Sequence, residues 1–262
     1  MEVVDRIFGS LIPILVIVGI IAAIVALVRR RGGVVEEEPG IGTVKRLYYY
    51  GLSFVALMVA ASGIALLVDF VAERLFGSEI LVGGETQLAL GLALTLVGTP
   101  IWLLHWSFAQ RALAEFPGEA RALSRKVYLY LVLGVSAAVT AAGLVSLLRW
   151  LLGADTFQGW HIALPLVWGG VWAFHWRVED LEGQTAELAR SVRRLYVYIT
   201  ALYGLGMLAT GVDLALGQFL REAYDALFAT EPLLSADGGL WSDTTRTAVA
   251  IALVGGGFWW WH

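Results

Sequence analysis

Three histidines occupy the same place in a recurring Trp-x-x-His pattern. The pattern occurs as Trp102 with His105, Trp172 with His175, and Trp259 with His262. Neutral imidazole is a common axial ligand of the metal in a tetrapyrrole, and a neighbouring indole can pack on the macrocycle. These six residues are therefore candidates for binding a haem or a chlorophyll-type cofactor, with two of the histidines on one ring.

A fourth histidine lies on the same predicted helix as His175. His161 precedes it by 14 residues, which is about 21 Å along an α-helix and close to the same face. This spacing resembles that of the cytochrome b family, whose helices carry two haems near opposite membrane faces. The resemblance covers one helix only, because the equivalent positions in the other two runs are Gly91 and Ala248. An outer haem would therefore lack a second ligand in this chain.

Anchoring at the membrane interface is the alternative interpretation of the same residues, and we favour it. Tryptophan and tyrosine gather at membrane interfaces because an apolar ring with one polar N–H or O–H suits that layer, and histidine is at home beside them. Duplication of a segment also copies residues that have no chemical role. A polar pocket for a lipid headgroup is a third possibility.

The composition indicates a membrane protein. Hydrophobic residues make up 58% of the chain and charged residues 15%, and the mean hydropathy is +0.74. A helix needs roughly 20 apolar residues to cross a hydrocarbon core of about 30 Å. No alternating pattern of spanning strands is visible. We therefore predict an all-α, polytopic membrane helical bundle with seven transmembrane helices, at 11–28, 47–69, 86–106, 127–152, 157–176, 195–217 and 245–262.

The distribution of basic residues predicts the orientation of these helices. Of the 18 lysines and arginines, 13 fall in the segments 29–46, 107–126 and 177–194. Short loops rich in lysine and arginine stay in the cytoplasm, so we expect the N-terminus outside and His262 inside. Such basic edges are typical of lipid headgroup contact, and we predict no nucleic-acid partner.

Each Trp-x-x-His run follows another apolar run that opens with two basic residues and two tyrosines. These openings are Lys45, Arg46, Tyr48 and Tyr50; Arg125, Lys126, Tyr128 and Tyr130; and Arg193, Arg194, Tyr196 and Tyr198. The pattern predicts three two-helix repeats, 45–106, 125–176 and 193–262, in a membrane domain 45–262 that follows an N-terminal anchor 1–30 and a cytoplasmic linker 31–44. Small residues recur at one depth around Gly63, Gly143 and Gly211, where we expect helices to touch.

Residues 45–262 resemble an uncharacterised bacterial family of multi-pass membrane domains, classed only as a domain of unknown function. Helices of that family open with Arg-x-x-Tyr-x-Tyr, which is matched here from Arg125 and Arg193, while the first repeat has Lys45 instead. The resemblance implies repeated hairpins in a bacterial cytoplasmic (inner) membrane. It implies no activity.

Several chemistries are excluded or disfavoured. The chain has no cysteine, which excludes disulfides, thiolate metal sites and cysteine nucleophiles. Ionisable residues in the predicted spans are few, and we expect the pairs Asp69 with Arg149 and Asp213 with Arg246 near the outer ends. No series of carboxylates crosses the middle, which disfavours a proton pump or cation channel.

Three classes of function remain. We favour a structural or accessory subunit of a larger membrane complex, with no catalytic activity of its own. Its partners would be the lipid bilayer and either other membrane subunits or further copies of this chain. A tetrapyrrole-binding electron carrier is the first alternative. A small-molecule transporter is the second, because Pro100 and Pro165 interrupt predicted helices, although few polar side chains accompany them.

Overall fold

The structure, a computed structural model, describes residues 42–77, 84–183, 187–228 and 239–262. The chain divides into two compact units, Met1–Gly40 and Ile41–His262. The first unit lies outside the described residues, and with it the predicted span 11–28 and most of the predicted linker. The anchor at 1–30 and the linker at 31–44 therefore stay predictions, and the fold concerns the second unit.

The described residues form six long α-helices and contain no strand, which confirms the all-α prediction. Two short 3-10 helices, Pro117–Arg121 and Gly239–Trp241, lie between them. The long helices are α2 (Thr43–Phe76), α3 (Gly84–Glu115), α4 (Leu123–Leu151), α5 (Trp160–Glu182), α6 (Glu187–Phe228) and α7 (Asp243–Trp261).

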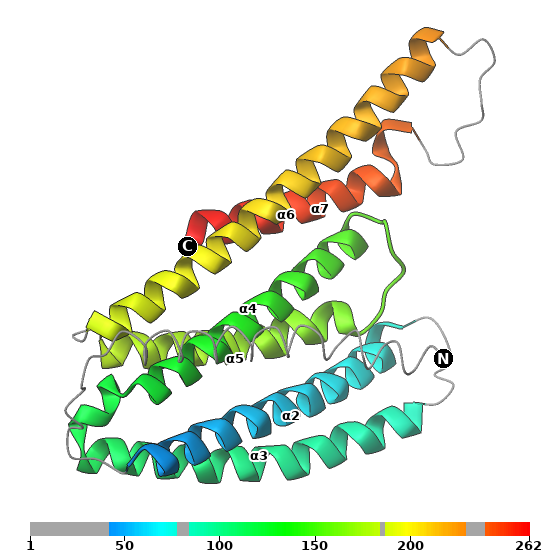
Figure 1. Cartoon of the computed structure of the whole chain (residues 1–262). Helices are drawn as coiled ribbons and strands as arrows, with labels where there is room; N and C mark the ends of the chain where they lie inside the picture. Colours follow the sequence, from blue (N-terminus) through cyan, green and yellow to red (C-terminus); the bar gives the residue numbers. More distant parts are fainter. Residues whose placement is uncertain (1–41, 78–83, 184–186, 229–238) are drawn as a thin grey trace. The chain divides into compact units, whose positions relative to one another are not determined.

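The helices pack in consecutive pairs, α2 with α3, α4 with α5 and α6 with α7, which we call hairpins 1, 2 and 3 (Figure 1). The first helix of a hairpin also packs against the next hairpin. Helix α2 contacts α4 and α5, and α4 contacts α6 and α7. The same arrangement of helices therefore occurs at two junctions, one between hairpins 1 and 2 and one between hairpins 2 and 3.

Glycines bring the two helices of each hairpin close together. A Cβ atom added at these glycines would lie only 2.6 Å from an atom of the partner helix: Thr95 N for Gly63, Pro165 Cδ for Gly143 and Ala252 N for Gly211. Such close approach is the usual basis of helix packing in lipid, where apolar burial between helices gives little net stabilisation. The prediction that these small residues mark helix contacts is confirmed.

Four helices are long and apolar enough to cross a membrane: α2 from Val44, α3, α4, and α6 from Arg190. They indicate a membrane protein. Helices α5 and α7 do not reach this hydropathy, and the run 11–28 is not described, so seven transmembrane helices are not supported. The sequence-based count relied on run length. Helix α5 is rich in tryptophan and histidine, and α7 contains three consecutive glycines and two charged residues, which lower the mean hydropathy.

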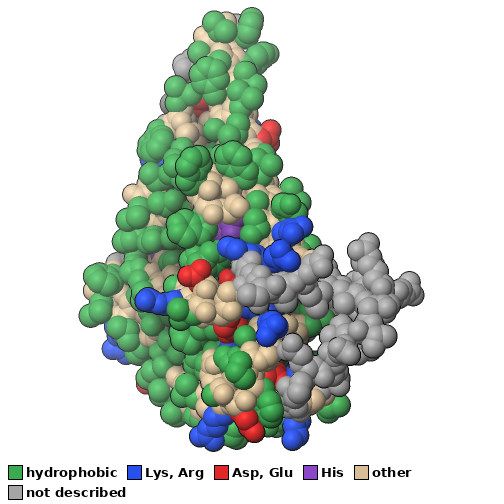
Figure 2. All heavy atoms as spheres, turned by 90° about the vertical axis from the view of Figure 1, so that its left-hand side faces the viewer, with side chains coloured by type: hydrophobic (Ala, Val, Ile, Leu, Met, Phe, Trp, Pro, Cys, Tyr) green, Lys and Arg blue, Asp and Glu red, His purple; other side chains and the backbone are tan. Residues whose placement is uncertain are grey.

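Helices α2, α4 and α6 all begin at one end of the hairpins, which we call the tyrosine end. Figure 2 faces this end, where lysine, arginine, aspartate and glutamate side chains gather among hydrophobic ones. At the opposite end, the predicted pairs of Asp69 with Arg149 and Asp213 with Arg246 are wrong. Arg149 binds Asp155 at 2.9 Å and Arg246 binds Asp243 at 3.0 Å, because these carboxylates lie only a few residues away along the chain.

Candidate functional site

Each histidine of the Trp-x-x-His pattern contacts the first tyrosine of its own hairpin. The distances from histidine Nε2 to tyrosine Oη are 3.4 Å for His105 and Tyr48, 3.2 Å for His175 and Tyr128, and 3.1 Å for His262 and Tyr196. The other ring nitrogen, Nδ1, lies 2.8, 2.8 and 3.0 Å from the carbonyl oxygen four residues earlier in the helix. A carbonyl only accepts, so Nδ1 carries the proton and Nε2 accepts from the tyrosine hydroxyl.

A tryptophan of the preceding hairpin completes two of these contacts. Trp102 Nε1 donates to Tyr128 Oη at 3.4 Å, and Trp172 Nε1 donates to Tyr196 Oη at 3.1 Å. Hydrogen bonds therefore run in one direction, from tryptophan N–H to tyrosine O–H to histidine Nε2. We call each such set a Trp–Tyr–His chain. Each chain joins the second helix of one hairpin to both helices of the next.

Aromatic rings pack in the same way at both junctions. Ring centroids are 5.7 Å apart for Tyr50 and Tyr128, and 5.5 Å apart for the equivalent Tyr130 and Tyr196. Likewise, Trp102 lies 6.2 Å from Phe174, and Trp172 lies 6.3 Å from Trp261. These separations are in the favourable range for aromatic pairs. The two junctions therefore share hydrogen bonds and ring contacts as well as helix arrangement.

Buried ion pairs lie at the tyrosine end, beside the Trp–Tyr–His chain of Trp102, Tyr128 and His175. The Nη2 atom of Arg125 lies 2.5 Å from Glu182, and its Nη1 atom donates to Tyr50 Oη at 3.2 Å. Lys126 binds the other oxygen of Glu182 at 3.2 Å. The distribution of these basic residues in the sequence predicts topology only. Their carboxylate partner was missed, because nothing in its spacing distinguishes it from other acidic loop residues.

Two further carboxylates were also missed. Glu119 accepts from Arg46 at 2.6 Å, and Glu179 accepts from the hydroxyl of Tyr130 at 2.6 Å. Glu119 and Glu179 are both buried, whereas Asp180, the residue after Glu179 in α5, is exposed. Basic and tyrosine residues that open hairpins 1 and 2 are therefore held by acidic residues in the last turns of α5 or just after α3.

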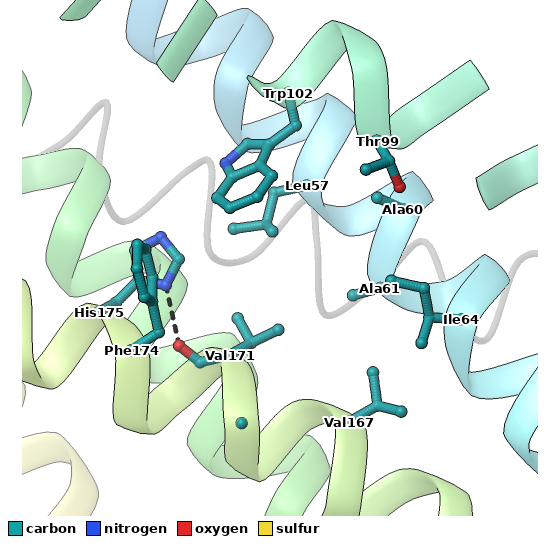
Figure 3. A pocket seen from close by; sticks show the side chains of 11 residues that line it. Leu57, Ala60, Ala61, Ile64, Thr99, Trp102, Val167, Val171, Phe174 and His175 are labelled. Atoms are coloured by element: carbon teal, nitrogen blue, oxygen red, sulfur yellow. Dashed lines mark hydrogen bonds between the residues drawn. The ribbon is translucent and has the colours of Figure 1, made fainter. Parts of the chain in front are cut away.

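An apolar groove of about 300 Å³ lies between α2, α3 and α5 (Figure 3). Leu57 and Ala61 of α2 face Val167 and Val171 of α5 across it, and the rings of Trp102 and His175 lie toward one end. The volume is at the low end of ligand pockets, which span roughly 300–1,000 Å³. Its lining is nearly all apolar, so it suits an apolar chain better than a polar ligand.

The three pattern histidines are held in three different hairpins, each with a tyrosine hydroxyl at Nε2. Among the described residues no group of three or more His, Cys, Asp or Glu side chains is placed to hold a metal ion. His161, the proposed outer-level ligand, is buried with Nδ1 2.6 Å from Ser146 Oγ and Nε2 3.1 Å from the Thr156 carbonyl oxygen. A tetrapyrrole held by His175 would first have to displace Tyr128.

In comparisons with known proteins, one family model matches part of the chain. Neither the curated proteins nor the solved structures gave a match. The predicted resemblance to a family of unknown function is confirmed over α2, α3 and α4. There, residues 46–159 match the family model described as Domain of unknown function (DUF5671).

Proposed function

We propose that this chain is a structural or accessory subunit of a larger membrane complex, without catalytic activity of its own. One observation carries the proposal: the Trp–Tyr–His chains at the two junctions. They occupy both ring nitrogens of His175 and His262, since Nε2 accepts from a tyrosine of the neighbouring helix and Nδ1 donates to a carbonyl oxygen of the histidine's own helix. The residues best suited to hold a cofactor serve instead to fasten one hairpin to the next.

We further propose that all six described helices and the run 11–28 cross the membrane. Helix α5 has 23 residues and α7 has 19. At 1.5 Å per residue they extend about 29–35 Å, close to the hydrocarbon thickness of about 30 Å. Each packs along a helix that is apolar enough to span. The basic loops support a bacterial cytoplasmic membrane, with the tyrosine end in the cytoplasm.

Single cysteines test this orientation, since the natural chain has none. Ala114 is exposed at the tyrosine end, and Gln158 is exposed in the turn before α5 at the opposite end. An impermeant thiol reagent should label Gln158→Cys in intact cells and Ala114→Cys only after the membrane is permeabilised. The reverse pattern would overturn the orientation.

Tetrapyrrole binding is the alternative function that a specific observation favours. His175 donates Nδ1–H to a carbonyl oxygen, which is how metal-binding histidines are usually oriented, and the apolar groove lies beside its ring. A haem here would supply electron-transfer chemistry. Trp102 would then pack on the macrocycle rather than donate to Tyr128.

The visible absorption spectrum of the purified protein distinguishes the two functions. A Soret band that disappears in His175→Ala would refute the structural proposal. We expect instead a colourless protein in which His175→Ala lowers the free energy of unfolding. The matched control is His105→Ala, which should lower it less, because its partner Tyr48 is exposed and receives no tryptophan N–H from another hairpin in the described part of the chain.

A further inference from the structure

We propose that copies of this chain pack head to tail, with hairpin 1 of a second copy placed against α6 as hairpin 2 is placed against α2. The inference rests on the proposed function, because it extends the contacts that fasten hairpins within one chain. It names the partner as another copy of the same chain.

The first observation is a face that is covered in two hairpins and uncovered in the third. Tyr50 and Tyr130, on the first helices of hairpins 1 and 2, are 3% and 7% exposed, whereas the equivalent Tyr198 of α6 is 68% exposed. Two turns further along, the equivalent exposures are 4% for Leu57, 2% for Ala137 and 45% for Leu205. In α2 and α4 this face is covered by the following hairpin. On α6 it presents the same residue types without that cover.

The second observation is the complementary face at the other end of the series. Tyr128 and Tyr196 are 2% and 5% exposed because the preceding hairpin covers them, whereas Tyr48 is 57% exposed. Tyr48 is thus the one pattern tyrosine whose hydroxyl meets its histidine but no tryptophan in the described part of the chain. Conversely, Trp259 is a pattern tryptophan without a tyrosine acceptor among the described residues, and it is exposed.

These two faces fit each other by the contacts already present at both internal junctions. Tyr198 of one copy would pack on Tyr48 of the next, as Tyr50 packs on Tyr128 and Tyr130 on Tyr196. Trp259 would donate to the same hydroxyl, which completes a third Trp–Tyr–His chain with His105. Pairing the N–H is favourable because an unpaired polar group in an apolar medium is costly.

Membrane geometry permits this arrangement. Tyr48 and Tyr198 both lie near the beginning of their helices, at the tyrosine end, so neighbouring copies keep the same orientation across the bilayer. Helix α6 would contact α2 and α3 of the next copy, as α2 contacts α4 and α5. A contact between two different faces is heterologous, and it generates a closed ring or an open row rather than a two-fold dimer.

Cross-linking in membranes of cells that express two differently tagged variants tests the inference. One variant carries Tyr48→Cys and the other carries Tyr198→Cys, and a short bifunctional thiol reagent is added. We expect a cross-linked species that contains both tags. The matched control replaces Tyr198→Cys by Tyr203→Cys, an exposed tyrosine about 140° around the same helix. This control pair should give little product.

The possible outcomes separate the inference from the proposed function. Products that join two Tyr48→Cys chains or two Tyr198→Cys chains, without the mixed product, would indicate a symmetric interface and overturn the head-to-tail arrangement. No product at all would mean that lipid or another segment covers these faces, which also overturns it. Tyr50→Cys with Tyr128→Cys in a single chain should cross-link internally. Failure of that internal pair would instead refute the junction contacts on which the proposed function depends.

Discussion

Removal of one hydroxyl group tests the Trp–Tyr–His chain directly. In Tyr128→Phe the ring stays in place, but Trp102 N–H loses its acceptor at 3.4 Å and His175 Nε2 loses its donor at 3.2 Å. Hydrogen bonds between membrane helices average about 0.6 kcal/mol and reach about 1.7 kcal/mol. Both contacts here are long, so we assign neither of them more than the average value, and together they give about 1.2 kcal/mol. Leaving buried partners unpaired adds to this value. We expect a loss of about 1–3 kcal/mol.

The matched control is Tyr48→Phe, which removes the same atom from the equivalent position of hairpin 1. Tyr48 is exposed and makes one contact of 3.4 Å to His105, so its loss should stay within about 0.5 kcal/mol. Unfolding of the purified proteins by denaturant in mixed micelles, followed by far-ultraviolet circular dichroism, measures the free energy of unfolding for each.

Two results would refute this reasoning. If Tyr128→Phe and Tyr48→Phe lowered the free energy of unfolding equally, the Trp–Tyr–His chain at the junction would add no stability beyond the tyrosine–histidine contact within a hairpin. A double-mutant cycle of Tyr128→Phe with His175→Ala provides the second check. Residues that share a hydrogen bond should show a coupling energy of at least about 0.5 kcal/mol, and purely additive losses would contradict the contact.

The remaining predictions concern packing and buried charge. Gly143→Leu should lower the free energy of unfolding by about 1–3 kcal/mol, because a Cβ there meets Pro165 Cδ at 2.6 Å. Gly134→Leu on the same helix, where nothing lies within 4 Å, should leave thermal stability in detergent nearly unchanged. Glu182→Gln should cost about 3 kcal/mol, because buried Arg125 and Lys126 lose their carboxylate. Asp180→Asn, which changes an exposed carboxylate of the same helix, should cost within about 0.5 kcal/mol in the same unfolding measurement.

The sequence by itself determined the all-α class, the membrane character and the approximate positions of the six described helices. Long apolar runs leave few other ways to satisfy backbone hydrogen bonds in lipid, so composition and run length were enough. The small residues at Gly63, Gly143 and Gly211 also predicted where helices touch, because close backbone approach requires the absence of a side chain. Length and hydropathy support four of the predicted spans, because tryptophan, histidine and glycine in the other described helices lengthen a run without raising its hydropathy.

The tertiary structure alone decided which partner each polar group has. Trp102 lies three residues from His105 in sequence, yet it donates to Tyr128 of the next hairpin. Tyr50 and Tyr198 occupy the same place in the repeated motif, yet one is buried and the other is exposed. Lipid and a neighbouring helix are similarly apolar, so hydropathy does not distinguish the faces that meet them. Only the packing of α2 against hairpin 2, and of α4 against hairpin 3, determines which tyrosines are covered and which tryptophans find an acceptor.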